Sequence, residues 1–347
     1  MAGLIDVLPA GPTGPARLSL AARVEERLLI PAYASRWAFA SISAHRTMSL
    51  PLQLMGQAQR RTVHLGAARI EVLGVGRPKL IDPLCARLFG ELPAPRLEGR
   101  HLTWSPIGLT DLEADLVVAE VHSWMTPRFR RAGWLIVPSS VRWHGDVGSV
   151  PPQEPSRSLL ANLAKIRKHG FSLVQAGGPA DWAEFYETMV EPQARARHGS
   201  RVWIPSPDFR RKLARRATLH FVLEDGVRVA GACTIPRGDM VWFPLLGVLE
   251  GDPELLQRGA SVAALALPLD WARQQNYRRF DLGRTGPFVN DGLQEYKRKW
   301  GFLPVPDPLT HFTAVWLGSD TARRVFRHQP VLVEDGVGLR TYAGETR

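Results

Sequence analysis

The sequence predicts an α+β protein made of two halves, each a mostly antiparallel mixed sheet covered by helices. Its 347 residues exceed the usual single domain of about 100–200 residues. In the second half, helices and a three-stranded meander follow one another without the strict βαβ alternation of a parallel sheet. The segment "VGSVPPQEPSRS", rich in proline and glycine, predicts a linker near residue 150. We therefore expect an N-terminal arm (1–20), a first half (21–150), a second half (151–320) and a C-terminal tail (321–347).

The first half is predicted from periodicity and turn residues. In 21–33, apolar residues interleave with charged ones up to Pro31, which predicts a helix. "TVHLGAARIEVLGVG" predicts two strands joined at Gly66. The remaining expected elements are a helix at 80–89 and strands at 101–104, 116–121 and 134–137.

The second half begins with "SRSLLANLAKIRKHGF", whose leucines recur at helical spacing. Ser156 or Ser158 can cap this helix and Gly170 can end it. Asp225-Gly226 predicts a hairpin within the meander, and Arg237-Gly238-Asp239 a second turn. The other expected elements are a strand at 172–175, helices at 181–197 and 206–217, a long helix at 254–275, and strands at 278–283 and 312–317.

The composition is that of an ordinary globular protein, with 45% hydrophobic and 22% charged residues. The longest uncharged run, 47–59, has 13 residues and is shorter than the roughly 18–20 needed to span a bilayer. The first residues lack the basic start and continuous apolar core of a signal peptide. We expect a cytoplasmic protein without a membrane span.

Several kinds of site are excluded by missing motifs. Only Cys85 and Cys233 occur, which argues against a disulfide framework and predicts two small buried residues. The ten histidines are dispersed, so we expect no metal cofactor. The sequence has no P-loop, no G-x-G-x-x-G after a strand and no G-x-S-x-G. NTPase, dinucleotide-dependent dehydrogenase and serine hydrolase activities are therefore not expected.

The net charge of +11 is typical of proteins with phosphate-rich partners, or of a basic proteome background. From Arg195 to Arg216 the sequence has eight basic residues and a single acidic residue, Asp208. Such a run is either a solvated helix face or a phosphate-binding surface.

Four segments taken together resemble a known family: "LLANLAKIRKHGFSL", "FYETMVEPQARARHGS", "LHFVLEDGVRVAGACTI", and "FDLGR" followed by "EYKRKWGF". Their order is similar to that of the Fem-type branch of the GNAT acyltransferase superfamily, with its aminoacyl-tRNA-dependent transferases and the related CelD-like acetyltransferase domains. The resemblance covers about residues 156–317, and residues 60–147 resemble a degenerate first GNAT half. It implies tandem GNAT-like halves.

The resemblance implies that Lys297, with Tyr296 beside it, lies next to the reacting groups, and that Asp281 and Arg284 form a polar pair at a strand end. A fixed cation can stabilise the negative charge that acyl transfer develops on the carbonyl oxygen. Asp281 could orient the amine or accept its proton. The structural alternatives are a solvated Lys297, and an Asp281 that caps a turn or pairs with Arg279 or Arg284.

A second group of residues implied by the resemblance is Tyr186, Arg195, Arg197 and His198, which would line the donor or acceptor cleft. We expect Arg197 or His198 to reach a phosphate or carboxylate. The alternative is that the basic residues only cap a helix C-terminus.

The donor stays open between acyl-CoA and aminoacyl-tRNA. Acetyl-CoA-binding domains carry a glycine-rich loop at a helix start, whereas "LQRGASVAALAL" has Gly259 without a second glycine in register. No segment after residue 150 matches the coiled-coil arm of longer Fem-type ligases, so a peptidoglycan substrate is not implied.

The predicted function is N-acyl transfer to a small-molecule or peptide amine, with tRNA as a partner if tRNA carries the acyl group. The alternatives are a non-catalytic GNAT-fold binding protein that assists polysaccharide, peptide or lipid assembly, and a nonspecific nucleic-acid binder. The sequence leaves the oligomeric state open.

Overall fold

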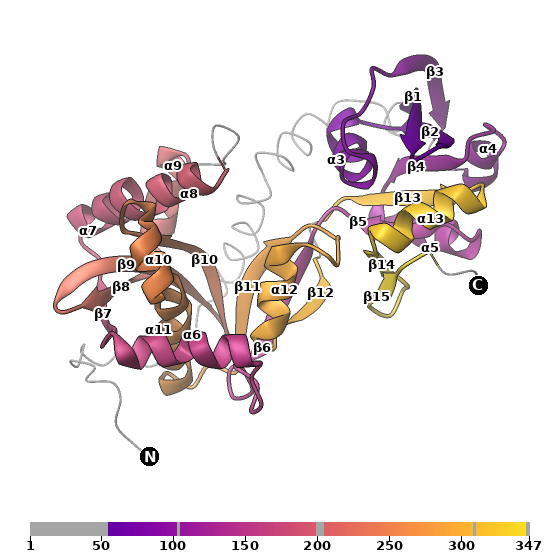
Figure 1. The fold of residues 1–347 in the computed structure, drawn as a ribbon. Helices are drawn as coiled ribbons and strands as arrows, with labels where there is room; N and C mark the ends of the chain where they lie inside the picture. The colour runs from indigo at the N-terminus through magenta and orange to yellow at the C-terminus, as the bar shows by residue number, and fades with distance from the viewer. Residues whose placement is uncertain (1–54, 103–104, 199–204, 308–309, 345–347) are drawn as a thin grey trace. The chain divides into compact units, whose positions relative to one another are not determined.

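The computed structural model describes residues 55–102, 105–198, 205–307 and 310–344 (Figure 1). Two compact units divide these residues. The first unit holds residues 55–141, Arg284–Glu295 and 304–344, and the second unit holds Arg142–Gly283 and Tyr296–Leu303. The helix expected at 21–33 and the N-terminal arm lie outside the described residues.

The first unit contains a six-stranded mixed sheet in the order β3-β1-β2-β4-β13-β5. Its strands are antiparallel to their neighbours except β2 and β4, which run parallel. The elements are β1 (Met55–Leu65), β2 (Ala68–Val75), α3 (Pro78–Phe89), β3 (Arg96–Leu102), α4 (Pro106–Thr110), β4 (Leu116–Val121), η1 (Ser123–Met125), α5 (Thr126–Arg131), β5 (Leu135–Pro138), β13 (Phe312–Leu317), α13 (Asp320–His328), β14 (Val331–Glu334) and β15 (Leu339–Tyr342).

Both faces of this sheet are buried, because successive residues of its strands point to opposite sides. Val72 belongs to a cluster with α3, α13 and the β14–β15 hairpin, whereas its neighbour Leu73 belongs to a cluster with α4, η1 and α5. Strands β4 and β5, with the sequences LVVAEV and LIVP, are accordingly almost entirely apolar. Cys85 is buried in the first cluster, and its burial raises the pKa of its thiol to about 12.

The C-terminal part of the chain differs from the expectation. The strand expected at 312–317 forms, but it pairs with β4 and β5 in the first unit's sheet rather than joining the second half. Residues 321–344, expected to be a tail, form most of α13 and the hairpin, and bury Phe326, Val331 and Tyr342. Hydrogen bonding between strands far apart in the chain decides this placement.

The second unit is built on a seven-stranded mixed sheet in the order β12-β6-β11-β10-β9-β8-β7. Strands β7 to β10 are antiparallel to their neighbours, and β10 and β11 run parallel. The elements are β6 (Val141–Asp146), α6 (Arg157–Lys168), β7 (Ser172–Ala176), α7 (Pro179–Glu184), the π-helix η2 (Phe185–Val190), α8 (Glu191–His198), α9 (Pro207–Ala214), β8 (Thr218–Glu224), β9 (Val227–Arg237), β10 (Met240–Val248), η4 (Leu249–Gly251), α10 (Pro253–Arg258), α11 (Ala260–Gln274), β11 (Arg279–Thr285), α12 (Gly292–Lys299) and β12 (Leu303–Pro306). The division between the units falls within β6, β11, α12 and β12.

Local sequence signals explain most boundaries in this unit. The Ser156 hydroxyl accepts a hydrogen bond from the Leu159 amide and caps α6, as expected. Asp225 and Gly226 both have positive φ and form the expected hairpin turn. The long helix expected at 254–275 is instead two helices, because Gly259 adopts φ +103° between α10 and α11.

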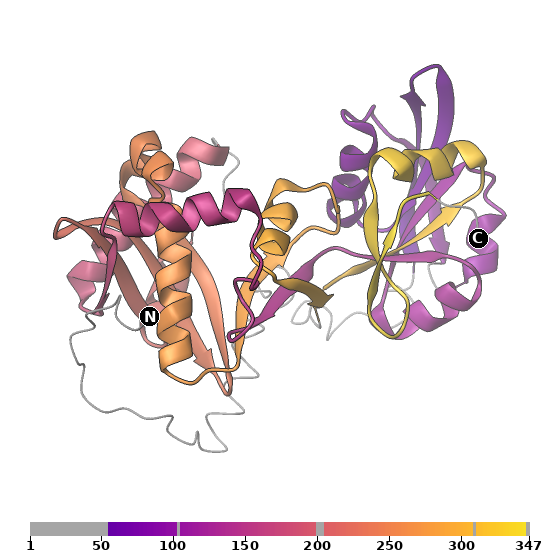
Figure 2. The ribbon, with the colours of Figure 1, turned by 60° about the horizontal axis from the view of Figure 1, so that its bottom comes forward.

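Helices cover both faces of the second unit's sheet. Gly231 of β9 lies against Phe185 of η2, whereas its neighbour Ala232 pairs with His220 of β8, whose ring contacts Trp271 of α11. Since neighbouring residues of a strand point to opposite faces, η2 and α11 lie on opposite sides of the sheet. Figure 2 shows α6 and α11 together on one face.

Candidate functional site

The parallel strands β10 and β11 of the second unit part at Asp281. They pair only from Met240 and Arg279 to Trp242 and Asp281, while β10 continues along β9 as far as Val248. The register of β10 also shifts between Trp242 and Leu245, which inserts one extra residue at this point. Bulges of this kind occur next to active sites, and a ligand can approach the backbone where two strands stop pairing.

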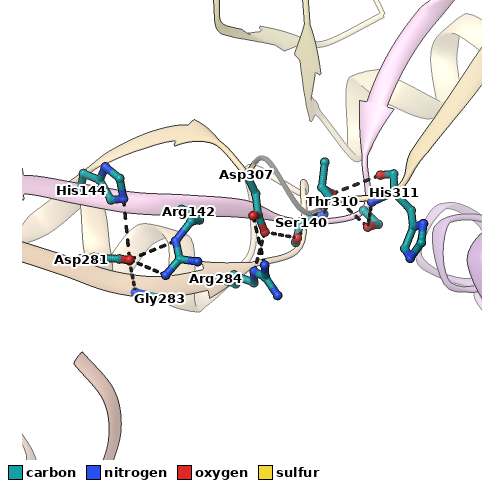
Figure 3. A network of polar contacts seen from close by, with 10 residues as sticks. Ser140, Arg142, His144, Asp281, Gly283, Arg284, Asp307, Thr310 and His311 are labelled. Atoms are coloured by element: carbon teal, nitrogen blue, oxygen red, sulfur yellow. Dashed lines mark hydrogen bonds and ion pairs between the residues drawn. The ribbon is translucent and has the colours of Figure 1, made fainter. Parts of the chain in front are cut away.

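Asp281 itself is a completely buried, fully paired carboxylate (Figure 3). Its Oδ2 accepts hydrogen bonds from Nε and Nη2 of Arg142, at 3.0 Å for Nε, and its Oδ1 accepts one from the Gly283 amide at 2.9 Å. Burial alone would raise the pKa of Asp281, but His144, Arg142 and the Gly283 amide outweigh it and lower the pKa. Asp281 is therefore held ionised.

These contacts decide between the alternatives for Asp281. The contact with the Gly283 amide is the expected turn cap. The expected ion pairs are wrong, because Arg279 pairs with Asp239 and Arg284 pairs with Asp307. A buried carboxylate with this set of donors positions its neighbours and is not open to an incoming amine.

Arg284 lies in the first unit, across the division from Asp281. Its guanidinium pairs with the buried Asp307 at 2.5 Å, and Asp307 also accepts a hydrogen bond from the Ser140 hydroxyl at 2.9 Å (Figure 3). The strand-end pair of Asp281 and Arg284 expected from the sequence does not form. Each residue instead belongs to the polar network of its own unit.

The face of the second unit's sheet that holds Asp281 also carries an aromatic ring and two arginines. Trp242 is opposite Asp281 in the register, and it shares its side of the sheet with the residues that η2 covers. The guanidinium carbons of Arg237 and Arg142 lie 4.2 Å and 5.9 Å from the centre of a Trp242 ring. Arg142 is at the same time paired with Asp281, so an aromatic ring, an ion pair and Arg237 meet on this face of the sheet.

Lys297 and Tyr296 lie in the last turns of α12. Lys297 is only 3% exposed, which excludes the alternative of a solvated lysine, whereas its neighbours Arg298 and Lys299 are exposed. Burial raises the pKa of Tyr296 to about 12, and the positive charge of Arg197 opposes this rise. Tyr296 therefore keeps its proton at neutral pH and can donate a hydrogen bond but not act as a base.

The second expected group is divided between packing and surface positions. Tyr186 is buried and stacks with Trp182, and the guanidinium of Arg210 lies 4.9 Å from its ring. Arg195 is exposed and pairs with Glu191 one turn earlier. Arg197 is exposed near the end of α8, and its positive charge acts on Tyr296 of α12. His198 is the last residue of α8.

The basic run is partly neutralised within its own helices. Glu191 accepts contacts from both Arg195 and Arg210, and Arg211 pairs with Asp208. Arg215 and Arg216 follow α9. The remaining charge gives this part of the second unit an excess of positive side chains.

The equivalent edge of the first unit is filled by a side chain of the protein. There the parallel strands β2 and β4 lead to Arg77 at the start of α3 and to Glu120. The Glu120 carboxylate accepts one hydrogen bond from the backbone amide of Arg77, at 2.9 Å, and one from Nε of the Arg77 side chain, at 2.8 Å. Burial opposes ionisation of Glu120, but these contacts outweigh it and lower its pKa. An internal carboxylate thus occupies a helix start that could otherwise attract an anion.

Arg142 and His144 were missed as site residues by the sequence analysis. Both lie on β6, and their spacing of two puts them on one face of the strand, opposite the buried Val141, Trp143 and Gly145. This alternation of polar and apolar residues in "VRWHGD" was the available signal.

Two general features concern the described part of the chain alone. Within it, no cluster of three or more His, Cys, Asp or Glu side chains could hold a metal ion. None of the helices there combines the length and apolar character that a membrane crossing requires.

Comparison with known proteins identifies the class of the second half. Residues 156–298 match the family model described as an acetyltransferase (GNAT) domain. The resemblance of the second half to the GNAT superfamily is thereby confirmed. No curated protein was found to match the chain.

The chain shows a low similarity to several solved structures. L-PGS from Bacillus licheniformis is 13% identical, with a TM-score of 0.40 over 76% of this chain and 82% of that chain. FemX is 12% identical, with a TM-score of 0.39 over 74% of this chain and 88% of that chain. A GCN5-related N-acetyltransferase from Sphaerobacter thermophilus is 16% identical, with a TM-score of 0.32 over 58% of each chain.

Proposed function

We propose that the second unit is an N-acyltransferase that moves an acyl or aminoacyl group from an activated donor to an amine and forms an amide. The observation that carries this proposal is the parting of β10 and β11 at Trp242 and Asp281, inside the segment that matches the GNAT acetyltransferase model. Beyond this point the backbone N–H and C=O groups of β10 and β11 do not hydrogen-bond to one another. The carbonyl group of an acyl donor can bind to such backbone groups.

The proposed reaction involves three chemical events. The amine nitrogen attacks the donor carbonyl, the bond to sulfur or oxygen of the leaving group breaks, and the amine loses a proton. The burial of Lys297 supports a role in stabilising the charged oxygen, because a cation acts more strongly where water is excluded. Tyr296, which keeps its proton, can orient the substrate by donating a hydrogen bond. Arg197, exposed beside it, suits an anionic part of the substrate.

Two donors fit this proposal. An acyl-CoA would place its pyrophosphate at the start of α11, where Gly259 has no side chain. An aminoacyl-tRNA would place phosphates along the basic residues of α8 and α9. Gly259 stands without a second glycine in register, and part of the basic run is paired with Glu191 and Asp208. We therefore carry both donors into the experiment.

Thermal-shift and filter-binding measurements with acetyl-CoA, longer acyl-CoAs and total aminoacylated tRNA test the proposal, each at two salt concentrations. Stabilisation by a CoA ester identifies an acyl-CoA N-acyltransferase. Preference for charged over uncharged tRNA identifies an aminoacyl transferase.

Two other outcomes contradict the proposal. Equal binding of charged and uncharged tRNA that weakens steeply with salt, without any response to CoA esters, indicates a nonspecific nucleic-acid binder. No response to either donor favours a non-catalytic binding protein.

A further inference from the structure

The proposed reaction needs a group that accepts the proton of the amine, and Asp281 does not provide it. The Asp281 side chain is completely buried, and the contacts from Arg142 and Gly283 occupy both of its oxygens. Tyr296 keeps its proton up to about pH 12 and is no base at neutral pH. The proton must therefore pass to a group other than Asp281 and Tyr296.

His144 is the titratable side chain that extends the Asp281 network toward solvent. Its Nε2 lies 3.8 Å from Oδ2 of Asp281, and within the described residues this buried nitrogen has no hydrogen-bond partner. The rest of the side chain is not enclosed, because 26% of it is exposed. Figure 3 shows His144 and Arg142 approaching the carboxylate of Asp281 from the same strand, β6.

The distance of 3.8 Å is longer than a hydrogen bond, which ordinarily has a donor–acceptor separation of about 2.7–3.2 Å. Catalytic hydrogen bonds are often long in ligand-free proteins and shorten when substrate binds. With its proton on Nε2, which faces the Asp281 carboxylate, the imidazole would leave Nδ1 as the acceptor.

The charged groups placed against His144 are Asp281 from β11 and Arg142 from its own strand. The guanidinium of Arg142 pairs with the carboxylate and offsets its negative charge.

We propose that His144 is the catalytic base of this site, with Asp281 and Arg142 as its positioning residues. This inference rests on the proposed N-acyltransferase function. As the amine nitrogen bonds to the carbonyl carbon, Nδ1 of His144 takes one proton from that nitrogen. As the bond from carbon to the leaving sulfur or oxygen breaks, His144 returns the proton to the leaving group. Atoms and charges balance without any further reactant.

The test uses the full-length protein with two labelled donors, acetyl-CoA and total aminoacylated tRNA, and hydroxylamine as the amine. His144→Gln removes the base with little change in size, and His64→Gln, an exposed position of β1 in the first unit, is the matched control. We expect His144→Gln to lower kcat by about 10²–10⁴-fold with little change in the donor KM. The acid limb of the pH–rate profile should disappear, and imidazole in solution should restore part of the activity of His144→Ala.

The outcomes separate the two proposals. If the wild type transfers label and His144→Gln does so at the same rate with the same pH profile, the role of His144 is overturned and the transferase function stands. If the wild type transfers label from neither donor, the function fails and the inference fails with it. Should both His144 variants unfold, ¹⁵N spectra of histidine-labelled wild type decide, since a proton fixed on Nδ1 across neutral pH contradicts the role.

Discussion

Arg142 donates hydrogen bonds from Nε and Nη2 to one oxygen of the Asp281 carboxylate, and the two residues are 139 positions apart in the chain. The Asp281 side chain is inaccessible to solvent and that of Arg142 is 12% exposed. The pair joins β6 to β11 beside the point where β10 and β11 part. It thus links the stability of the second unit to the shape of its candidate site.

Breaking this pair should be costly. Removing one partner of a buried ion pair leaves the other charge unpaired, and such changes typically destabilise by about 3–5 kcal/mol. We expect Asp281→Asn and Arg142→Met each to lower the free energy of unfolding in urea by an amount of this order. The double variant should lose less than the sum of the two. Arg211→Met, which breaks an exposed pair with Asp208, is the control and should change little. Additive single effects would contradict a direct pair.

Stability should also depend on pH through His220. This residue is completely buried against Thr234 and Trp271, and burial lowers its pKa to about 3. In the unfolded chain a histidine has a pKa near 6.5. Below about pH 6.5 the unfolded state therefore gains a proton that the folded state does not, so stability falls as the pH falls toward 3, by up to about 1.4 kcal/mol per pH unit.

Urea unfolding between pH 7 and 5 measures this dependence, because most carboxylates stay ionised in that range. His220→Gln should flatten the curve, while His64→Gln, at an exposed position, should leave it unchanged. An unaltered slope in His220→Gln would show that the folded protein tolerates a protonated His220.

Lys297 and Lys299 offer a matched pair on one helix, the first buried and the second exposed. If Lys297 stabilises the charged carbonyl oxygen, Lys297→Met should lower kcat for transfer by about 10²–10³-fold, the usual effect of removing one such group. Lys299→Met should remain close to the wild type. Both variants should unfold cooperatively in urea. Full activity of a folded Lys297→Met would remove Lys297 from the site.

Arg197 tests the anion-binding part of the proposal. Hydrogen bonds to charged groups contribute about 1.5–3 kcal/mol, so Arg197→Ala should weaken donor binding by about tenfold or more. Arg69→Ala, an exposed arginine of the first unit, is the control. Filter binding or calorimetry with the donor that stabilises the wild type measures the change. Unchanged affinity in Arg197→Ala would show that Arg197 does not bind the donor and acts only through its charge on Tyr296.

The two cysteines should be unreactive in the folded protein. Both are buried, and burial raises the pKa of each thiol, so neither forms the reactive thiolate. We expect Ellman's reagent to modify neither residue in native buffer and both in concentrated guanidinium chloride. Rapid reaction of one thiol under native conditions would reveal local opening around α3 or β9.

Local elements followed from the sequence because short-range chemistry determines them. Gly66 and Asp225-Gly226 provide the positive φ that their turns require, and Ser156 caps α6 with its own hydroxyl. The exception was Gly259, predicted inside a helix. Its left-handed conformation divides α10 from α11. This conformation depends on the packing around Gly259, which includes the side chain of Lys165.

The candidate site was predicted only in part. Lys297, Tyr296 and Asp281 were named from a resemblance, and the structure gives them environments that the sequence did not specify, namely burial for Lys297 and an arginine partner from β6 for Asp281. Arg142 and His144 were not named. The spacing of a single strand does not indicate which other strand lies beside it, so their contact with β11 could not be predicted.

By itself the sequence determined the α+β class, many of the strands, the basic charge and the GNAT resemblance of the second half. Only the tertiary structure decided that Phe312–Leu317 completes the first sheet and that Asp281 and Arg284 turn to different partners. The reason is physical. Periodicity and turn chemistry act over a few residues, whereas a buried charge must take whichever opposite charge the strand pairing brings within reach, however distant it is in the chain.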